Sequence, residues 1–146
     1  MICVDASIIV AVLQPEELSD KADLLIQRWG ATREQMVAPD FLIAEVSSAV
    51  RRGRYTGRTA PDEADVALQE FRMLPIRLHS CESLLDAAWG WGERLNTPRL
   101  YDMFYLALAE QLACDLWVVE KKLVNIVGSQ SARVRWVGDV EDGPNP

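Results

Sequence analysis

Three acidic residues lie within apolar stretches of the sequence, and carboxylates in such settings are candidates for chemistry. Asp5 closes the apolar run Ile2–Val4, whereas Glu45 and Asp102 interrupt or open apolar runs of their own. A buried carboxylate is costly unless a partner compensates its charge. A divalent cation compensates several converging carboxylates most simply, and hydrated Mg²⁺ held by acids can cleave phosphodiesters. The three acids therefore predict a metal-dependent site that hydrolyses phosphodiester bonds.

Asp5 follows a predicted buried strand, and parallel sheets form their sites at the carboxyl ends of strands. Ser7 is two residues further on and is spaced to direct its hydroxyl to the same point. The alternative role of Asp5 is to cap the N-terminus of the next helix.

Glu45 falls at the edge of the apolar face of its helix when residues are placed at about 100° intervals. Its alternative role is an acid at that edge that points to solvent.

Asp102 falls near the centre of a helical apolar stripe, so the pattern predicts its burial. The stripe consists of Tyr105, Leu106, Ala109, Leu112 and Ala113. A first-turn acid gains under about 1 kcal/mol from the helix dipole, which does not offset full burial. A metal or a buried arginine is then needed, and an exposed helix end is the alternative.

Glu120 follows the predicted strand Leu116–Val119, which places it at the same sheet rim as Asp5. Its alternative role is the first-turn acid of the next helix. Asp115 lies at the other end of that strand, about 13 Å away at roughly 3.3 Å per residue. We therefore exclude Asp115 from the predicted site.

Short apolar strands alternate with helices along the chain. Strands are predicted at Ile2–Val4, Met36–Ala38, Ile76–Leu78, Leu116–Val119 and Val134–Val137. Helices are predicted after Asp5 to Leu13, at Glu16–Trp29 ended by Gly30, from Asp40 to Gly53, after a Thr59 N-cap, and at Cys81–Leu95, Asp102–Cys114 and Lys121–Val127. This alternation predicts an α/β three-layer sandwich with a central parallel sheet flanked by helices.

The 146 residues, 49% of them hydrophobic, predict one domain at 1–140 and a frayed polar tail at 141–146. No apolar run approaches the roughly 20 residues of a membrane span, and the first residues lack a basic n-region. We therefore expect a cytoplasmic protein. Cys3, Cys81 and Cys114 are scattered in apolar settings, which predicts reduced core thiols. With the lone His79 they do not have zinc-site spacing.

The formal net charge of −7 argues against a nucleic-acid partner, because phosphate binding favours a basic surface. The positive charge is grouped, however. One cluster surrounds Arg51 and Arg52, and another is Lys121 with Lys122. Solvated helix ends are the alternative explanation of each cluster.

The sequence resembles the PIN domains, and among them the VapC toxins of toxin–antitoxin pairs. The matching segments are Val4–Ser7, Ala38–Val46, Ala49–Arg54, Tyr101–Ala109 and Leu116–Leu123, in order from residue 2 to about 137. The resemblance implies a PIN-like fold, a carboxylate pocket for Mg²⁺ or Mn²⁺, and ribonuclease activity on RNA. It also implies a homodimer and inhibition by a cognate VapB-like antitoxin.

Asp5, Glu45 and Asp102 match the metal-binding acids of that family, and Ser7 matches the accompanying hydroxyl. The departure is at the fourth acid. The family usually has Thr/Ser-x-Asp, where this chain has Val118-Val119-Glu120. A glutamate can ligate the same ion through a longer side chain, and this difference bears on whether one metal or two bind.

The resemblance and the residues together predict an endoribonuclease. Asp5 and Asp102 hold the metal, Glu45 binds it directly or through water, and Glu120 is the fourth acid. Arg51, Arg52 and Lys121 are the candidate contacts to the RNA backbone.

Two alternatives remain open from the sequence. The first is a catalytically weakened PIN-like protein that binds RNA or regulates. The second is a phosphoacceptor receiver domain, which requires a second acid beside the first, whereas Cys3-Val4-Asp5 offers none.

Overall fold

The computed structural model describes residues 1–141, so the predicted frayed tail, apart from Glu141, lies outside the described residues. Five strands form one parallel sheet in the order β3-β2-β1-β4-β5. They are β1 (Ile2–Val4), β2 (Met36–Pro39), β3 (Ile76–His79), β4 (Asp115–Val118) and β5 (Val134–Trp136). Each agrees with its predicted range to within one residue at either end.

Seven α-helices among the described residues connect and cover these strands. They are α1 (Ala6–Leu13), α2 (Ser19–Ala31), α3 (Leu42–Tyr55), α4 (Pro61–Met73), α5 (Leu85–Leu95), α6 (Tyr101–Gln111) and α7 (Lys121–Val127). Three 3₁₀ turns complete the fold, η1 (Glu82–Leu84), η2 (Gly128–Gln130) and η3 (Val137–Asp139). None of the helices within residues 1–141 has the length and apolar character needed to span a membrane.

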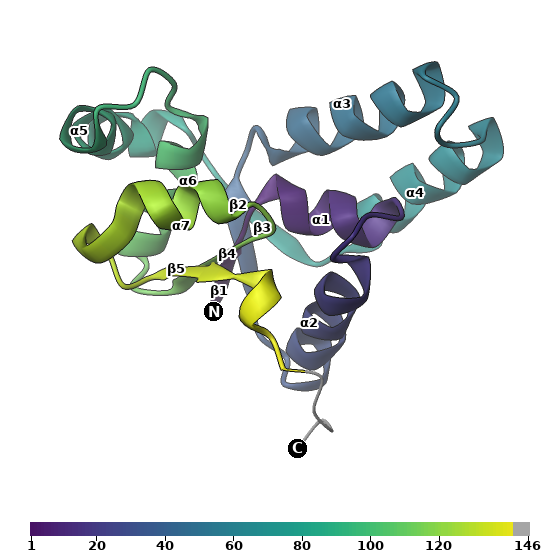
Figure 1. The fold of residues 1–146 in the computed structure, drawn as a ribbon, viewed down its shortest axis with the longest axis horizontal. Helices are drawn as coiled ribbons and strands as arrows, with labels where there is room; N and C mark the ends of the chain where they lie inside the picture. The colour runs from purple at the N-terminus through teal and green to yellow at the C-terminus, as the bar shows by residue number, and fades with distance from the viewer. Residues whose placement is uncertain (142–146) are drawn as a thin grey trace.

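The strand order determines which helices share a face of the sheet. The chain moves from β1 to β2 and β3 in one direction, then returns to β4 and β5 on the other side of β1. Because parallel crossovers are right-handed, α1 to α4 lie on one side of the sheet and α5 to α7 on the opposite side (Figure 1). The predicted α/β three-layer sandwich with a central parallel sheet is confirmed.

The reversal of direction occurs between β1 and β4, and a crevice forms at the carboxyl ends of two such strands. Two hydrogen bonds continue the pairing beyond the strands. The Asp5 N–H donates to the Trp117 carbonyl at 3.2 Å, and the Val119 N–H donates to Ser7 Oγ at 3.1 Å. The acids that follow the two strands are therefore held beside this crevice.

The core lies on both faces of the sheet, and α6 packs across β1, β2 and β4. Leu106 and Leu108 on α6 are fully buried, as is Leu116 on β4. All three cysteines are free thiols; Cys3 and Cys114 are buried as predicted. Cys81 is only half-buried, because it directly precedes η1, whose first two residues are exposed, rather than lying within a helix.

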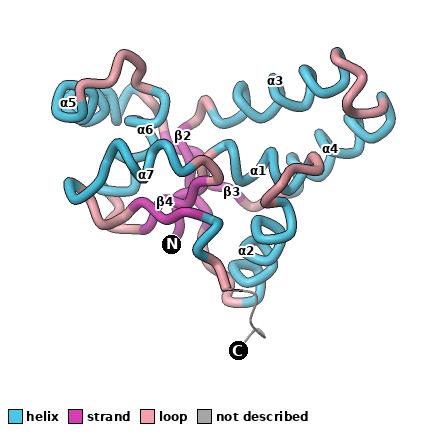
Figure 2. The backbone as a smooth tube through the Cα atoms, in the orientation of Figure 1, coloured by secondary structure: helices cyan, strands magenta, loops and turns pink. Residues whose placement is uncertain are grey.

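Helices α3 and α4 form an arm that projects from the sheet (Figures 1 and 2). Gly53 lets α3 approach its neighbours closely, since a Cβ there would lie 2.5 Å from the Gln14 amide nitrogen. That amide donates to the Thr59 hydroxyl at 3.0 Å, and both residues are buried. Thr59 is therefore not the N-cap that the sequence predicted. Ala60 occupies that position, and its N–H donates to the Glu63 carboxylate.

Several helix boundaries differ from the prediction for local reasons. Helix α2 begins at Ser19 rather than Glu16, because the Ser19 hydroxyl accepts from the Glu16 N–H and donates to the Ala11 carbonyl, which closes a turn. Helix α2 also continues through Gly30. The segment predicted as a helix from Cys81 starts as the 3₁₀ turn η1, and α6 ends at Gln111 because Ala113 adopts a left-handed φ of 52°.

Candidate active site

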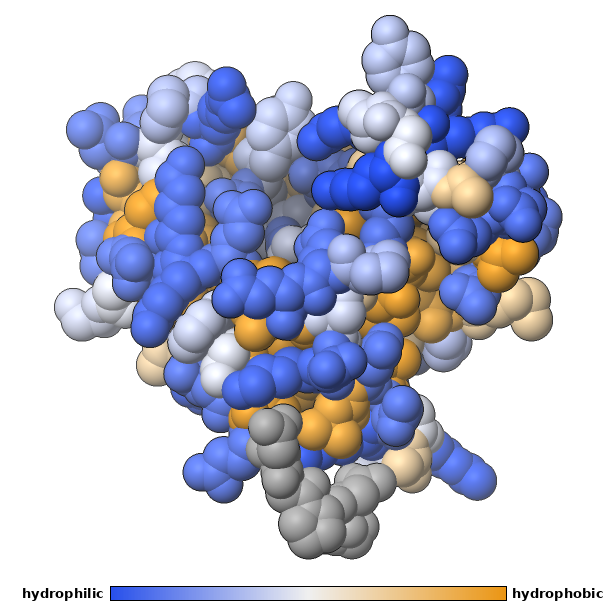
Figure 3. Space-filling model, turned by 45° about the vertical axis from the view of Figure 1, so that its right-hand side comes forward, coloured by the Kyte–Doolittle hydropathy of each residue, from blue (hydrophilic) through white to orange (hydrophobic). Residues whose placement is uncertain are grey.

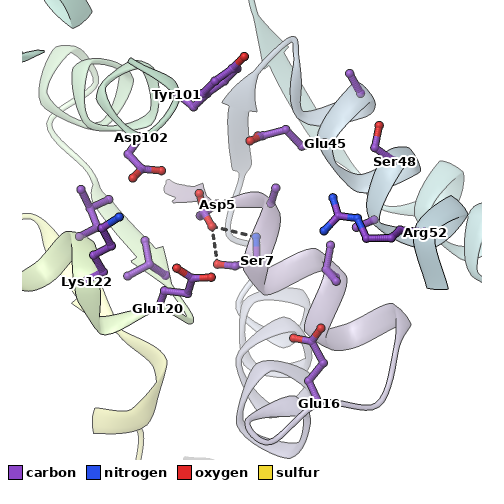
Figure 4. Close-up of a pocket in the computed structure, with 16 residues that line it drawn as sticks. Asp5, Ser7, Glu16, Glu45, Ser48, Arg52, Tyr101, Asp102, Glu120 and Lys122 are labelled. Atoms are coloured by element: carbon purple, nitrogen blue, oxygen red, sulfur yellow. Dashed lines mark hydrogen bonds between the residues drawn. The ribbon is translucent and has the colours of Figure 1, made fainter. Parts of the chain in front are cut away.

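One cavity of about 590 Å³ opens at the carboxyl end of the sheet, and the four predicted acids and the accompanying serine all line it. They are Asp5, Ser7, Glu45, Asp102 and Glu120. Figure 4 shows Asp5, Asp102 and Glu120 pointing into a shared space, with Glu45 approaching from α3 on the opposite wall. Residues far apart in the sequence thus meet where the strand order predicts a crevice.

The same local arrangement holds all four acids, because each lies at the N-terminal end of a helix. Asp5 is the N-cap of α1 and Glu120 occupies the N-cap position of α7. Glu45 and Asp102 lie in the first turns of α3 and α6. The positive ends of four helix dipoles therefore face the cavity and partly offset the clustered negative charge.

Asp5 is the most constrained of these acids. Its Oδ2 accepts hydrogen bonds from the Ser7 backbone N–H at 2.8 Å and from the Ser7 hydroxyl. Asp5 is therefore a helix cap as well as a pocket residue, and the two roles that the sequence left open coexist. Burial raises the pKa of Asp5 to about 7, the Ser7 hydrogen bonds oppose the rise, and Asp102 and Glu45 add to it.

Glu45 has a partner that sequence reasoning missed. The Tyr105 hydroxyl donates to Glu45 Oε2 at 2.6 Å, although Tyr105 is otherwise fully buried in the core. Burial raises the pKa of Glu45, the Tyr105 hydrogen bond lowers it, and the charge of Asp102 raises it. The sequence pattern predicts Tyr105 only as a member of the apolar stripe. Its hydroxyl group, three residues from Asp102 on the same helix, is the sequence feature that indicated a role of Tyr105 in the site.

The predicted burial of Asp102 is wrong for the residue as a whole, which is exposed. Helix α6 begins at Tyr101, so its first turn extends beyond the core to the cavity rim. The carboxyl group nevertheless faces the cavity. Its pKa is raised by desolvation and then by the charge of Glu120, and lowered by Lys122. These effects require Asp102, Glu120 and Lys122 to be near neighbours.

Glu120 is exposed and its side chain makes no capping hydrogen bond to α7. Glu120 thus lies at the start of α7, close to the alternative position that the sequence predicted, but its side chain does not cap the helix. Its carboxylate points into the cavity toward Asp5 and Asp102 (Figure 4). The neighbouring Val118 is buried and lines the cavity with an apolar side chain.

The donor set of this cavity fits a hard divalent cation, because it consists of carboxylate oxygens. Burial, and then the charges of neighbouring acids, already raise the pKa values of Asp5 and Asp102. Within residues 1–141, no group of three or more His, Cys, Asp or Glu side chains is arranged to hold one ion directly. A hydrated Mg²⁺, which needs only one or two direct carboxylates and keeps several waters, matches this spacing.

Two cations line the cavity with the acids, Arg52 on α3 and Lys122 on α7. Neither forms an ion pair with the described residues. Lys121, predicted to contact RNA, lies elsewhere, with its ammonium 4.3 Å from the centre of the Trp136 ring. Consecutive residues of a helix point about 100° apart, so only the second lysine reaches the cavity.

Arg51, the other predicted RNA contact, does not line this cavity. Its guanidinium lies 5.6 Å from the centre of the Tyr55 ring, in a neighbouring hollow along α3. The structure thus brings Arg52 to the carboxylates and places Arg51 in the neighbouring hollow. It also adds Lys122 to the cavity. The sequence pointed to the lysine pair but did not show which of the two lysines reaches the acids.

Comparisons with known proteins agree with this geometry. Residues 2–122 match the PIN domain family. Ribonuclease VapC3 of Mycobacterium tuberculosis is 35% identical over 122 residues, which cover 84% of each chain. Ribonuclease VapC9 of the same organism is 32% identical over 124 residues, covering 84% of this chain and 88% of its own.

A solved structure supports the fold independently. The crystal structure of VapC20 from Mycobacterium tuberculosis, described as a sarcin-ricin loop cleaving toxin, superposes with a TM-score of 0.60. It covers 80% of this chain and 87% of that chain at 17% sequence identity, so it speaks for the fold alone. The family match excludes the receiver-domain alternative. The chain belongs to the PIN-domain family and, within it, to the VapC ribonucleases.

Proposed function

We propose that this protein is a metal-dependent endoribonuclease and the toxin of a toxin–antitoxin pair. The observation that carries the proposal is the convergence of four carboxylates from four helix N-termini in one cavity. Beside them lie Arg52 and Lys122, which form no ion pair with any of residues 1–141. Acids that bind a cation, set beside bases that bind phosphate, suit the hydrolysis of a phosphodiester.

Each residue has a proposed task. Asp5 and Asp102 hold the cation, oriented by the Ser7 hydrogen bonds and by the first turn of α6. Glu45, held by Tyr105, binds it directly or through water, and Glu120 is the fourth acid. Arg52 and Lys122 contact the phosphates on either side of the reacting one.

A bound Mg²⁺ or Mn²⁺ supplies a more acidic water and stabilises the charge that develops on the phosphate oxygens. With water as the attacking group and the 3′ oxygen of the ribose as the leaving group, which takes up a proton, the products carry 5′-phosphate and 3′-hydroxyl ends. None of the described residues that line the cavity is a histidine, so proton removal falls to the carboxylates and water.

The proposed partners follow from the family. The VapC relatives imply an RNA substrate and a cognate VapB-like antitoxin, and we propose a homodimer as the working form. A catalytically weakened RNA-binding protein remains the second candidate, because Glu120 replaces the family's usual aspartate. The exposure of Glu120 and its direction into the cavity favour the active enzyme.

Incubation of the purified protein with total RNA tests the proposal. We expect cleavage in Mg²⁺ or Mn²⁺, none in EDTA, and products that carry 5′-phosphates. The variant Asp5→Asn keeps a residue able to cap α1 but removes the charge, and it should be inactive. A folded wild type that binds RNA without cleaving it would favour the weakened candidate.

A further inference from the structure

A second hollow continues from the carboxylate cavity along α3. It has a volume of about 640 Å³ and is lined by Ser47, Ser48, Arg51, Arg52, Tyr55 and Leu68. Ser48 and Arg52 line the carboxylate cavity too, so the two hollows adjoin. The upper right of Figure 3, where α3 and α4 lie, is largely hydrophilic, with a recess beside it.

All the lining residues except Leu68, which comes from α4, lie on α3. Ser48, Arg52 and Tyr55 are spaced four and three residues apart, which aligns them along the helix. Seven residues at about 1.5 Å each place Tyr55 roughly 10 Å beyond Ser48 along the axis. A ligand that enters the carboxylate cavity and follows α3 therefore reaches Tyr55 next.

Tyr55 is an aromatic ring without a packing role in the core. It is 80% exposed at the last position of α3. The Arg51 guanidinium lies 5.6 Å from the centre of its ring, which covers one face with a cation. The ring is thus presented as a flat surface with a positive charge behind it.

The charges around Tyr55 suit a polyanion. Neither Arg51 nor Arg52 has a carboxylate partner among residues 1–141, whereas Arg54 on the same helix pairs with Asp65 at 2.9 Å. The chain has a net charge of −7, so these two guanidinium groups create a locally positive surface on a protein that is negative overall. Basic grooves with interspersed aromatic rings are how proteins bind single-stranded nucleic acid.

We infer that Tyr55, backed by Arg51, is a stacking platform for an unpaired base of the RNA, outside the reacting nucleotides. Arg52 contacts the phosphate between the platform and the carboxylates. A base within a duplex has both faces covered by its neighbours, so the platform selects a single-stranded or looped segment. This inference rests on the proposed ribonuclease function and adds a substrate-binding site to it.

The test uses an RNA that the wild-type protein cleaves, trimmed one nucleotide at a time from either end. Tyr55→Ala should raise KM about tenfold with kcat nearly unchanged for RNAs long enough to reach the platform. For RNAs trimmed past it from one end, the variant and the wild type should have equal kcat/KM. Pairing the flanking nucleotides with a complementary strand should abolish the difference in the same way.

Replacements distinguish stacking from simple apolar contact. Tyr55→Phe and Tyr55→Trp should retain the wild-type KM, because they retain the ring face, and Tyr55→Leu should not. Trp89→Ala is the matched control, since Trp89 is another exposed aromatic residue, 58% accessible, on α5 and outside both hollows. It should leave the kinetics unchanged at every RNA length.

The outcomes separate this inference from the proposed function. A wild type that cleaves no RNA overturns both. A wild type that cleaves, with a Tyr55→Ala variant whose KM is unchanged or is raised equally at all lengths, overturns the platform alone. A wild-type KM in Tyr55→Leu also overturns it, because the contact with RNA would then be simply apolar and would not require the face of an aromatic ring.

Discussion

Asp5, Glu45, Asp102 and Glu120 each lie at the start of a different helix, and the fold sets their charges against one another. Desolvation by burial, followed by the charges of neighbouring acids, raises the pKa of the first three, and the hydrogen bonds from Ser7 and Tyr105 oppose that rise at Asp5 and Glu45. Those hydrogen bonds keep the two acids oriented while their charges remain poorly compensated. The arrangement favours a cation over any neutral ligand.

Asp102→Asn should abolish RNA cleavage, because it removes a cation ligand while conserving side-chain size. Removal of one charge from a like-charged cluster should leave the metal-free protein as stable as the wild type or more stable. Cleavage assays in Mg²⁺ and Mn²⁺, with a thermal melt in EDTA, check both parts. Full nuclease activity in this variant would refute the assignment of Asp102 to the site.

Tyr105→Phe tests the hydrogen bond that the sequence did not reveal. The Tyr105 hydroxyl stabilises the charged form of Glu45, so its loss should raise the pKa of that carboxyl further. The acidic limb of the pH–rate profile should then move upward by about one pH unit, the scale of one hydrogen bond to a charged group. A profile with an unchanged limb and a uniformly lower rate would indicate a packing role only.

Element by element, the sequence was sufficient where the local pattern decides the structure. The five strands are short apolar runs bounded by polar residues, and α7 matches its predicted range. The errors arose where contacts distant in sequence decide. Thr59 was predicted as a cap from its neighbours, but it is bonded to Gln14 on another element. Asp102 was predicted buried because a helical wheel does not show that a first turn extends past the core.

The sequence predicted all four acids that line the cavity, but of its three predicted RNA-contacting cations only Arg52 lines the cavity. Carboxylates in apolar frames at strand ends are a strong signal, since few structural roles explain them. The choice between Lys121 and Lys122 depends on the direction in which α7 leaves β4, and on the Trp136 ring that holds Lys121. That ring comes from β5, which no pattern around the lysines indicates.

Strand β5 supports the site from a distance. The Trp136 indole N–H donates to the Val119 carbonyl at 2.8 Å, and the Val119 N–H donates to the Ser7 hydroxyl at 3.1 Å. Gly138 leaves room for the ring, because a Cβ there would come within 2.3 Å of it. The peptide groups just before Glu120 are therefore held from both sides, by β5 and by the residue that orients Asp5.

Trp136→Phe should loosen the attachment of Glu120, because it removes the indole N–H that donates to the Val119 carbonyl. The substitution also replaces the indole by a smaller ring, and the control variant must match that loss. We expect about 1 kcal/mol lower stability and a several-fold weaker affinity for Mn²⁺, measured by calorimetric titration, with kcat at saturating metal nearly unchanged. Trp91→Phe is the matched control, because Trp91 also carries a cation on its ring, Arg94 at 4.4 Å, but lies on α5. Equal metal affinity in the two variants would contradict the role of β5.

At the scale of the whole molecule, the fold concentrates opposite charges in adjoining hollows. The cavity at the carboxyl end of the sheet gathers acids, and the face of α3 beside it carries Arg51 and Arg52, which have no carboxylate partner within residues 1–141. The net charge of −7 repels RNA from most of the surface. We therefore expect RNA to bind productively where the two hollows adjoin, since the proposed contacts to base and phosphate lie there beside the carboxylates.

The stability of the entire chain should reflect the carboxylate cavity through its dependence on pH. Asp5 has a pKa of about 7 in the folded protein against 3.8 for an ordinary aspartate. Between roughly pH 4 and 7 the unfolded chain has lost this proton while the folded chain retains it, so the contribution of Asp5 to stability falls as pH rises and levels off above about 7. Mg²⁺ should restore stability most strongly at the upper end of this range, where the carboxylate is charged.

Asp5→Asn removes that titration and retains a side chain able to cap α1. In EDTA, the difference in melting temperature between this variant and the wild type should therefore widen in favour of the variant from pH 4.5 to pH 8. Addition of Mg²⁺ at pH 8 should reverse the difference, because only the wild type retains the carboxylate as a ligand. Melting curves that stay parallel across this range, with and without Mg²⁺, would show that Asp5 bears neither the unfavourable charge nor the cation.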